Sequence, residues 1–277
     1  MPAGVPDAMV ALHARRSADS IAEWRSVRPS GGLLLALTGT DVYRDIHVDP
    51  VARQSLTLAD RLLVLQPKAL DELDAAARAK CDVVYQSAPT LTTGARYKNH
   101  FDLVQVGHLR HEKDPFTPIT ALRYLPTESR IRLTQIGNAL DAHHAETMPA
   151  VIREEPRLRW LGGVSHAATR QRIKRANLLV IASKMEGGAN VIIEAITAGV
   201  PVIASNVSGN IGMLGNDYAG YFAFADAEAC AALMQRAETG ARFMQQLTAA
   251  CAKRAKLFAP EREALAIRAR VQRLFYY

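Results

Sequence analysis

Two glutamates separated by seven residues flank a glycine pair in the second half of the chain. The segment Ser183 to Ala204 reads SKMEGGANVIIEAITAGVPVIA, and it follows an apolar run and opens a run of helical period. Unpaired N–H groups in the first turn of a helix favour an anion such as a diphosphate, and glycines let a backbone approach a ligand closely. Glu194 would lie about one turn into this helix, so we expect its carboxylate to face ribose hydroxyls. Taken alone, Gly187-Gly188 is more typical of an ordinary strand-to-helix turn.

A basic turn precedes this segment by about 70 residues and could hold the same anion. It reads VGHLRHEKD from Val106 to Asp114. The planar guanidinium of Arg110 is suited to phosphate oxygens, and Lys113 adds a second positive charge, whereas His108 is only partly cationic near neutral pH. The alternative is a basic turn that only faces water.

Polar residues after two apolar runs of the first half are candidates for a second ligand. The segment LTGTDVYRD runs from Leu37 to Asp45, and a pair of arginines follows the run Val10 to Leu12. The arginines could bind an anionic acceptor or merely face water, and both alternatives stay open. The predicted acceptor-side residues are Arg15, Arg16, Thr38, Thr40 and Asp41.

Short apolar runs that alternate with segments of helical period must position these residues. Continuous apolar strands between amphipathic helices predict an α/β fold with parallel sheets covered on both faces. The runs form two series, followed by a helical tail in which Ala264, Ile267, Val271 and Leu274 recur at helical spacing. The predicted strands are Val10 to Leu12, Leu33 to Leu37, Leu62 to Leu65, Val83 to Tyr85, Leu103 to Val106, Ile131 to Ile136, Leu158 to Leu161, Leu178 to Ile181 and Val200 to Ala204.

A polar stretch, SAPTLTTGARYKNH from Ser87 to His100, separates the two series and is the predicted linker. We expect two doubly wound Rossmann-like domains, at residues 1–95 and 96–277, with the active site in a cleft between them, because such sheets bind ligands at the carboxyl ends of their strands. One continuous sheet with an elaborated loop is the alternative.

Composition narrows the class of protein. Hydrophobic residues make up 49% and charged residues 22%, as in globular proteins, and the formal net charge is +7. Without an apolar run of membrane-spanning length or a recognisable nucleic-acid motif, we expect a cytoplasmic protein that binds small molecules, with no nucleic acid partner and no stable membrane insertion. The three cysteines form no metal or disulfide pattern, and His143, His144 and Glu146 lack a matched third ligand, so we expect no metal and no cofactor. Nothing in the pattern selects an oligomeric state.

The segment combines two glutamates that are separated by seven residues with the ending A-x-x-A-G-x-P-V-I-A. This combination resembles the family-4 glycosyltransferases of the GT-B architecture. The basic turn resembles their V-G-R-L…E-K-G turn, with His108 in the place of Arg, and Leu37 to Asp45 resembles their H-G-x-D segment, with Thr38 in the place of His. The resemblance implies that Glu186 contacts the donor sugar, that Glu194 binds the nucleotide ribose, and that the basic turn holds the donor diphosphate. The implied catalytic residues are Arg110, Lys113 and Glu186, and the implied donor-binding residues are His108, Gly187, Gly188, Ala189, Asn190, Val191 and Glu194.

Five segments spread over nearly the whole chain resemble the selenosugar synthases of selenoneine biosynthesis. This resemblance implies a UDP-activated N-acetylglucosamine donor and selenophosphate as an anionic acceptor, which would need positioning more than deprotonation. A lipid or glycan acceptor, or binding of a UDP-sugar without turnover, are the alternatives. The family's first domain normally opens with another strand and a Gly-rich loop, so we expect a shortened N-terminal domain. The segments are ALHARRSADSI, LTGTDVYRDI, VGHLRHEKDP, SKMEGGANVIIEA and SGNIGMLGNDYAGYF.

Overall fold

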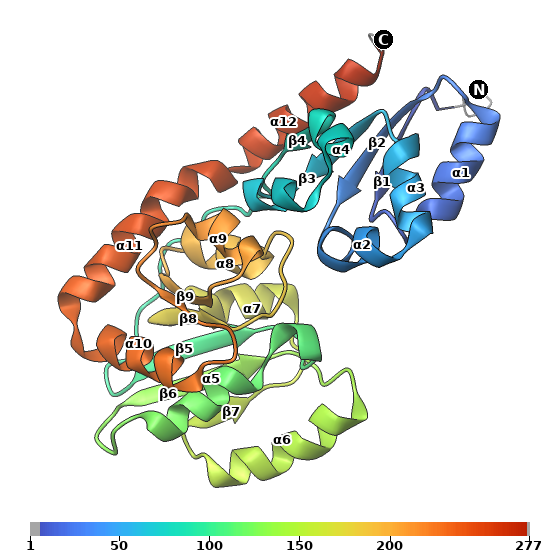
Figure 1. Ribbon diagram of the computed structural model, residues 1–277. Coiled ribbons are helices and arrows are strands. Elements are labelled where there is room, and N and C mark those ends of the chain that lie inside the picture. The colour runs from blue at the N-terminus through green and yellow to red at the C-terminus, as the bar shows by residue number, and fades with distance from the viewer. Residues whose placement is uncertain (1–5, 276–277) are drawn as a thin grey trace. The chain divides into compact units, whose positions relative to one another are not determined.

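The computed structural model describes residues 6–275 and divides them into two compact units. The first unit comprises residues 6–87, Met185–Gly188 and residues 257–275, and the second comprises Ala88–Lys184 and Ala189–Lys256. Each unit contains one sheet whose strand pairs are all parallel, with helices between the strands (Figure 1). This confirms the α/β class predicted from the alternation of apolar runs and helical segments.

The sheet of the first unit has the strand order β1-β2-β3-β4. Most of its helical segments lie between these strands, and the chain returns to the unit with a final helix. The strands are β1 (Ala8–Leu12), β2 (Gly32–Leu37), β3 (Arg61–Val64) and β4 (Cys81–Val83), and the α-helices are α1 (Ala18–Val27), α2 (Ile46–Val48), α3 (Pro50–Leu58), α4 (Ala75–Ala79) and α12 (Pro260–Gln272). A π-helical turn spans Asp41–Asp45, and 3-10 turns span Pro67–Glu72 and Arg273–Phe275.

At β2 both faces of the first sheet are buried, and successive side chains of this strand point to opposite faces. Leu33, Leu35 and Leu37 pack in one cluster with Ile21 of α1. Leu34 and Ala36 pack in a second cluster with Leu274 and with the half-buried Ala266 and Val271. The last helix therefore covers the second face of this sheet.

The helical tail thus differs in two ways from its sequence pattern. Residues 257–275 group with the first unit, whereas the predicted division at 96–277 would assign them to the second. Ala264 and Ile267, which belong to the helical stripe, are exposed, while Ala266 and Val271 face the sheet. The spacing of apolar residues locates a helix, but the face that packs depends on a partner distant in sequence.

The second sheet has the strand order β10-β9-β8-β5-β6-β7, so the order reverses between β8 and β5. Its strands are β5 (Phe101–Val106), β6 (Ile131–Ile136), β7 (Leu158–Trp160), β8 (Leu178–Ile181), β9 (Val202–Ser205) and β10 (Tyr221–Phe222). Its helices are α5 (Phe116–Ala121), α6 (Ala142–Glu154), α7 (His166–Ile173), α8 (Asn190–Thr197), α9 (Ser208–Leu214), α10 (Ala227–Thr239) and α11 (Ala241–Ala255), with 3-10 turns at His111–Lys113, Leu122–Tyr124 and Lys256–Phe258.

The predicted strands all overlap observed ones, although several boundaries shift by one or two residues and β10 was not predicted. Two residues are too short a run to give a periodic signal. Among the described residues, no helix combines the length and the apolar content that a membrane crossing requires.

Candidate functional site

The loops that follow β5, β6 and β7 are bonded to one another at the carboxyl edge of the second sheet. The N–H of Leu109 donates to the carbonyl of Asn138 (2.8 Å), and the N–H of Gly137 donates to the carbonyl of Gly162 (2.8 Å). Gly137 has φ of +147°, and a Cβ there would lie 2.0 Å from the carbonyl oxygen of Gly107. Only glycine fits this close crossing between the loops that follow β5 and β6.

The basic turn lies at this edge of the sheet, with two of its three cationic candidates at the surface. His108 and Arg110 are exposed, and the Nδ1 atom of His108 accepts the N–H of Asn138 (3.1 Å). In the neutral ring the proton therefore lies on Nε2, which is a donor. Half-buried Lys113 packs over Gly107, where a Cβ would lie 3.6 Å from the Lys113 Cγ and Cδ atoms.

Asp114 closes the basic turn with a left-handed backbone, at φ of +40° and ψ of +63°. Aspartate tolerates this conformation better than most residues, because its short side chain can form local hydrogen bonds. Its carboxylate accepts the hydroxyl of Thr117 (2.6 Å) and the Thr117 N–H (3.3 Å) at the start of α5. The E-K-G pattern has glycine at this position, and the local bonds explain how aspartate replaces it.

Helix α8 presents its amino end at the same edge. Its N-cap is Ala189, whose side chain has no acceptor, and the helix is held by the buried side chains of Ile192, Ile193 and Ile196. Asn190 is exposed and Val191 is half-buried. Backbone N–H groups in a first turn carry a partial positive charge, so this end can attract an anion.

The loop before α8 touches the basic turn. The N–H of Lys184 donates to the carbonyl of Glu112 (3.0 Å), and Ser183 and Lys113 line the same small cavity. The structure thus brings together two predicted groups, the basic turn and the segment that leads to α8.

Glu194 has a partner that the sequence did not reveal. Its carboxylate is bonded to Nε2 of His166, the first residue of α7, which lies 28 positions earlier in the chain. The Glu194 side chain is 12% exposed and that of His166 is 75% exposed. The ring sits at the solvent side of the carboxylate and fixes its orientation.

The segment Glu186 to Gly188 packs with the first unit. A Cβ on Gly187 would lie 2.1 Å from the carbonyl oxygen of Thr38, and one on Gly188 would lie 2.7 Å from Cβ of Leu65. The glycines are therefore required by contacts with the chain itself, a reason that differs from the close approach to a ligand expected from the sequence. Glu186 is buried.

Polar residues at the carboxyl edge of the first sheet bind mainly to one another. The carboxylate of Asp41 is fully buried and accepts the N–H groups of Thr38 (2.9 Å), Gly39 (2.7 Å) and Ala14 (3.2 Å). It ties the loop after β2 to the loop after β1. Thr38 is partly exposed.

His13 is a further residue of this edge that the motifs did not indicate. It is buried, has a left-handed backbone with φ of +72°, and bonds through Nε2 to the hydroxyl of Thr40 (3.0 Å). Arg15 and Arg16 follow it and are exposed, and Nε of Arg15 lies 3.3 Å from a carboxylate oxygen of Asp45. The feature that distinguishes His13 is its positive φ, and the residue types around it in the sequence do not reveal this backbone angle.

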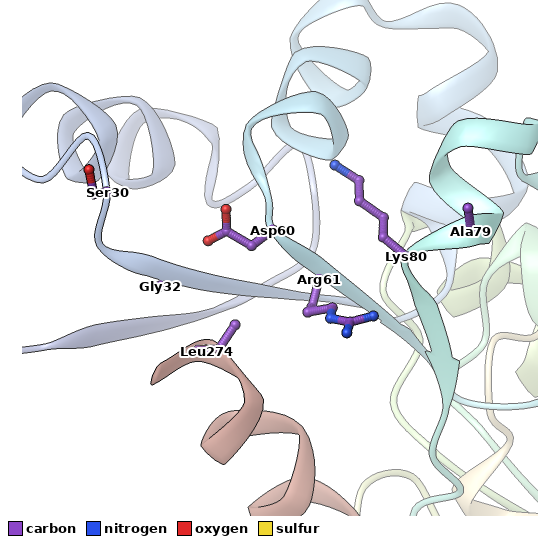
Figure 2. Close-up of a pocket in the computed structure, with 7 residues that line it drawn as sticks. All are labelled: Ser30, Gly32, Asp60, Arg61, Ala79, Lys80 and Leu274. Carbon is purple, nitrogen blue, oxygen red and sulfur yellow. The ribbon is translucent and has the colours of Figure 1, made fainter. Parts of the chain in front are cut away.

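Two other features, a cavity in the first unit and the histidines of α6, do not coincide with the predicted site residues. A cavity of about 450 Å³ lies near the amino ends of β2 and β3 in the first unit, and its charged side chains already have partners (Figure 2). Lys80 donates to the carbonyls of Ala59 and Thr57, and Asp60 binds Arg25.

Within residues 6–275, no three His, Cys, Asp or Glu side chains form a group that could hold a metal ion, and His144 is bonded to Asp141, the N-cap of α6.

Solved structures of glycosyltransferases share this fold. HepE from Anabaena, crystallised with UDP and glucose, is 16% identical with a TM-score of 0.79, over 96% of this chain and 78% of that one. Sucrose-phosphate synthase from Thermosynechococcus elongatus is 19% identical with a TM-score of 0.80, over 98% and 74%. The pneumococcal O-GlcNAc transferase GtfA, crystallised with UDP and GlcNAc, is 14% identical with a TM-score of 0.73, over 97% and 57%.

The fold is therefore the GT-B architecture, as the sequence predicted. No curated protein matches the chain in sequence. The family model described as "Glycosyl transferases group 1" matches residues 93–257, which is more than half of the 277 residues. The chain belongs to the group 1 glycosyl transferases and is a glycosyltransferase.

Proposed function

We propose that this glycosyltransferase takes its sugar from a UDP-sugar and binds the donor diphosphate at the amino end of α8. The observation that carries the proposal is the contact between the basic turn and the loop before α8, through the Lys184 to Glu112 hydrogen bond. This contact joins the turn that carries Arg110 and Lys113 to the loop that leads to α8, a helix whose N-cap makes no side-chain hydrogen bond. UDP in the HepE and GtfA crystals supports the choice of nucleotide.

Glu194 would bind the ribose in this arrangement. A carboxylate only accepts hydrogen bonds when ionised, so it suits two neighbouring hydroxyls and repels phosphates. The bond to His166 holds it in one orientation. Glu186, four residues before Asn190, would contact the donor sugar.

Transfer would depend on stabilising the departing diphosphate. Negative charge grows on the leaving oxygen as the sugar bond breaks, and preorganised donors lower the barrier without reorganisation at that moment. The donors proposed here are the N–H groups of Asn190 and Val191, the guanidinium of Arg110, the ammonium of Lys113 and Nε2 of His108.

For the finer substrate choice, we propose N-acetylglucosamine as the sugar and selenophosphate as the acceptor. The five segments that resemble selenosugar synthases support this choice, as do the exposed cations Arg15 and Arg16 and the partly exposed hydroxyl residues Thr38 and Thr40 in the loops after β1 and β2. An acceptor that is already ionised needs positioning, which can supply much of the rate enhancement. The product would carry a new bond between selenium and the anomeric carbon, with UDP released.

Mass spectrometry of reaction mixtures tests the proposal. The protein is incubated with UDP-N-acetylglucosamine or UDP-glucose, together with selenophosphate or thiophosphate. We expect UDP and a selenium-linked sugar phosphate from the first donor and selenophosphate. Release of UDP with a different acceptor product would contradict the acceptor, and binding of UDP-sugar without any turnover would contradict the catalytic proposal.

A matched pair of variants tests the ribose assignment in the same assay. Glu194→Ala should weaken UDP binding by about tenfold or more, because a hydrogen-bonded charge is lost. Glu146→Ala removes an exposed carboxylate of α6 and should change nothing. Full affinity and turnover in Glu194→Ala would refute the assignment.

A further inference from the structure

Two glutamines interrupt otherwise apolar stretches of β5 and β6 at matching positions. Gln105 and Gln135 are partners in the parallel register, so their side chains lie next to each other on one face of the sheet. They are 5% and 1% exposed. Burying an amide is costly unless its polar atoms are bonded, so the pair requires a physical explanation.

The amide nitrogens of both glutamines are bonded to backbone carbonyls, which offsets part of the cost of burying these side chains. The Gln135 Nε2 atom donates to Gly107 (2.8 Å) and Ile136 (3.3 Å), and the Gln105 Nε2 atom donates to Pro115 (3.3 Å). These bonds fix which end of each amide is nitrogen. Both Oε1 atoms are buried and accept no hydrogen bond from any protein group in the described part of the chain.

The two glutamines line a cavity of about 10 Å³ at the point where the strand order reverses. Its other walls come from Gly107, Lys113, Pro115 and Ser183, and from the end of β8. A space of this size holds about one water molecule. Carboxyl ends at a reversal of strand order are where doubly wound sheets bind ligands.

The chemistry of the walls selects water as the occupant. A water molecule can donate to both Oε1 atoms and still accept a hydrogen bond from the ammonium of Lys113. An anion would be repelled by the two amide oxygens, and a cation would be repelled by Lys113. The cavity is also too small for a larger molecule.

We propose that Gln105 and Gln135 hold one buried water beneath Lys113, and that this water positions the Lys113 ammonium for the donor diphosphate. The second part rests on the proposed function. Gln135 also donates to the carbonyl of Gly107, over which the carbon chain of Lys113 packs, so the pair supports the lysine through the backbone as well as through the water. Both glutamines are positioning residues.

UDP and uridine affinities of a double variant test the positioning role. In Gln105→Met with Gln135→Met, which keeps side-chain length, we expect UDP affinity to fall about fivefold while uridine affinity stays the same, because uridine has no diphosphate. Gln66→Met, which removes a buried amide of the first unit, should leave both affinities unchanged. Unchanged UDP affinity in the folded double variant would overturn the proposal.

A double-mutant cycle identifies the route of the effect. In a Lys113→Ala background, the two Gln→Met changes should cause almost no further loss of UDP affinity. An equal loss with and without Lys113 would show that the glutamines do not act through it. If the wild-type protein binds no UDP at all, the proposed function fails instead, and the water site remains testable.

A crystal structure of the wild-type protein at a resolution that shows ordered water tests the site itself and needs no variant. We expect one water about 3 Å from both Oε1 atoms and from Nζ of Lys113. Electron density that shows this space filled by protein atoms, or without a water, would overturn the proposal.

Discussion

The carboxyl edges of the two sheets carry similar polar residues and use them in opposite ways. In the first unit, Asp41 accepts three backbone N–H groups and His13 bonds to Thr40, so these side chains hold two loops together. In the second unit, Arg110 and Asn190 are exposed, and α8 starts at an alanine that cannot cap it. The contrast teaches that polar residues at strand ends can serve the fold itself, as at the first edge, and it supports the ligand-binding role that we propose for the exposed residues of the second edge.

Removing Asp41 gives the largest effect that we expect. Asp41→Ala leaves the N–H groups of Ala14, Thr38 and Gly39 without their acceptor, which should lower the free energy of unfolding of the first unit by about 3 kcal/mol. Chemical denaturation measures this loss, and Asp71→Ala, at an exposed side chain, is the control. Under conditions in which the Asp41→Ala variant is folded, its affinity for UDP should equal that of the wild type. A stable Asp41→Ala variant would remove the contrast between the edges.

Removing Arg110 should have the opposite profile. Arg110→Ala is expected to weaken UDP binding about tenfold, because charge-assisted bonds to phosphate are lost, with little change in thermal midpoint. Titration calorimetry and a thermal melt measure the two quantities, with exposed Arg153→Ala as the matched control. Loss of stability without loss of affinity would place Arg110 among the structural residues.

The sequence predicted the features of the second edge that follow local rules. The apolar runs locate β5, β6 and β8, and the glycine pair before a helical period locates the start of α8. Contacts between distant segments could not be predicted in this way. His166 meets Glu194 only through the fold, and Asp41, the first residue of the π-helical turn Asp41–Asp45, accepts the N–H of Ala14 from the loop after β1. The role of Gly187 also depends on Thr38, nearly 150 residues earlier.

The smallest effect concerns Asp102, near the amino end of β5. Burial raises the pKa of Asp102 to about 6, and His100 and nearby arginines only partly offset it. The folded state therefore holds its proton more tightly than the unfolded state, and stability is lost as pH rises from about 4 through 6. Asp102→Asn should be more stable than wild type by on the order of 1 kcal/mol at pH 7.5, and this advantage should vanish near pH 4.

Denaturation of both proteins at these two pH values measures the difference. A pH-independent difference would mean that the Asp102 charge does not cause it. With such a result, the carboxyl edges would be the part of each sheet where charged and polar side chains have their largest effects on stability or binding.

UDP binding by Asn190→Pro tests the central claim most directly. Proline is tolerated at the first position of a helix but lacks the N–H that we assign to the diphosphate. Ala227→Pro makes the same change at the start of α10, where the preceding residue has the same ψ of 92° as Ala189, and Asn190→Ala controls for the side chain. The account predicts at least about tenfold weaker UDP binding for Asn190→Pro alone. Wild-type affinity in a folded Asn190→Pro variant would contradict it.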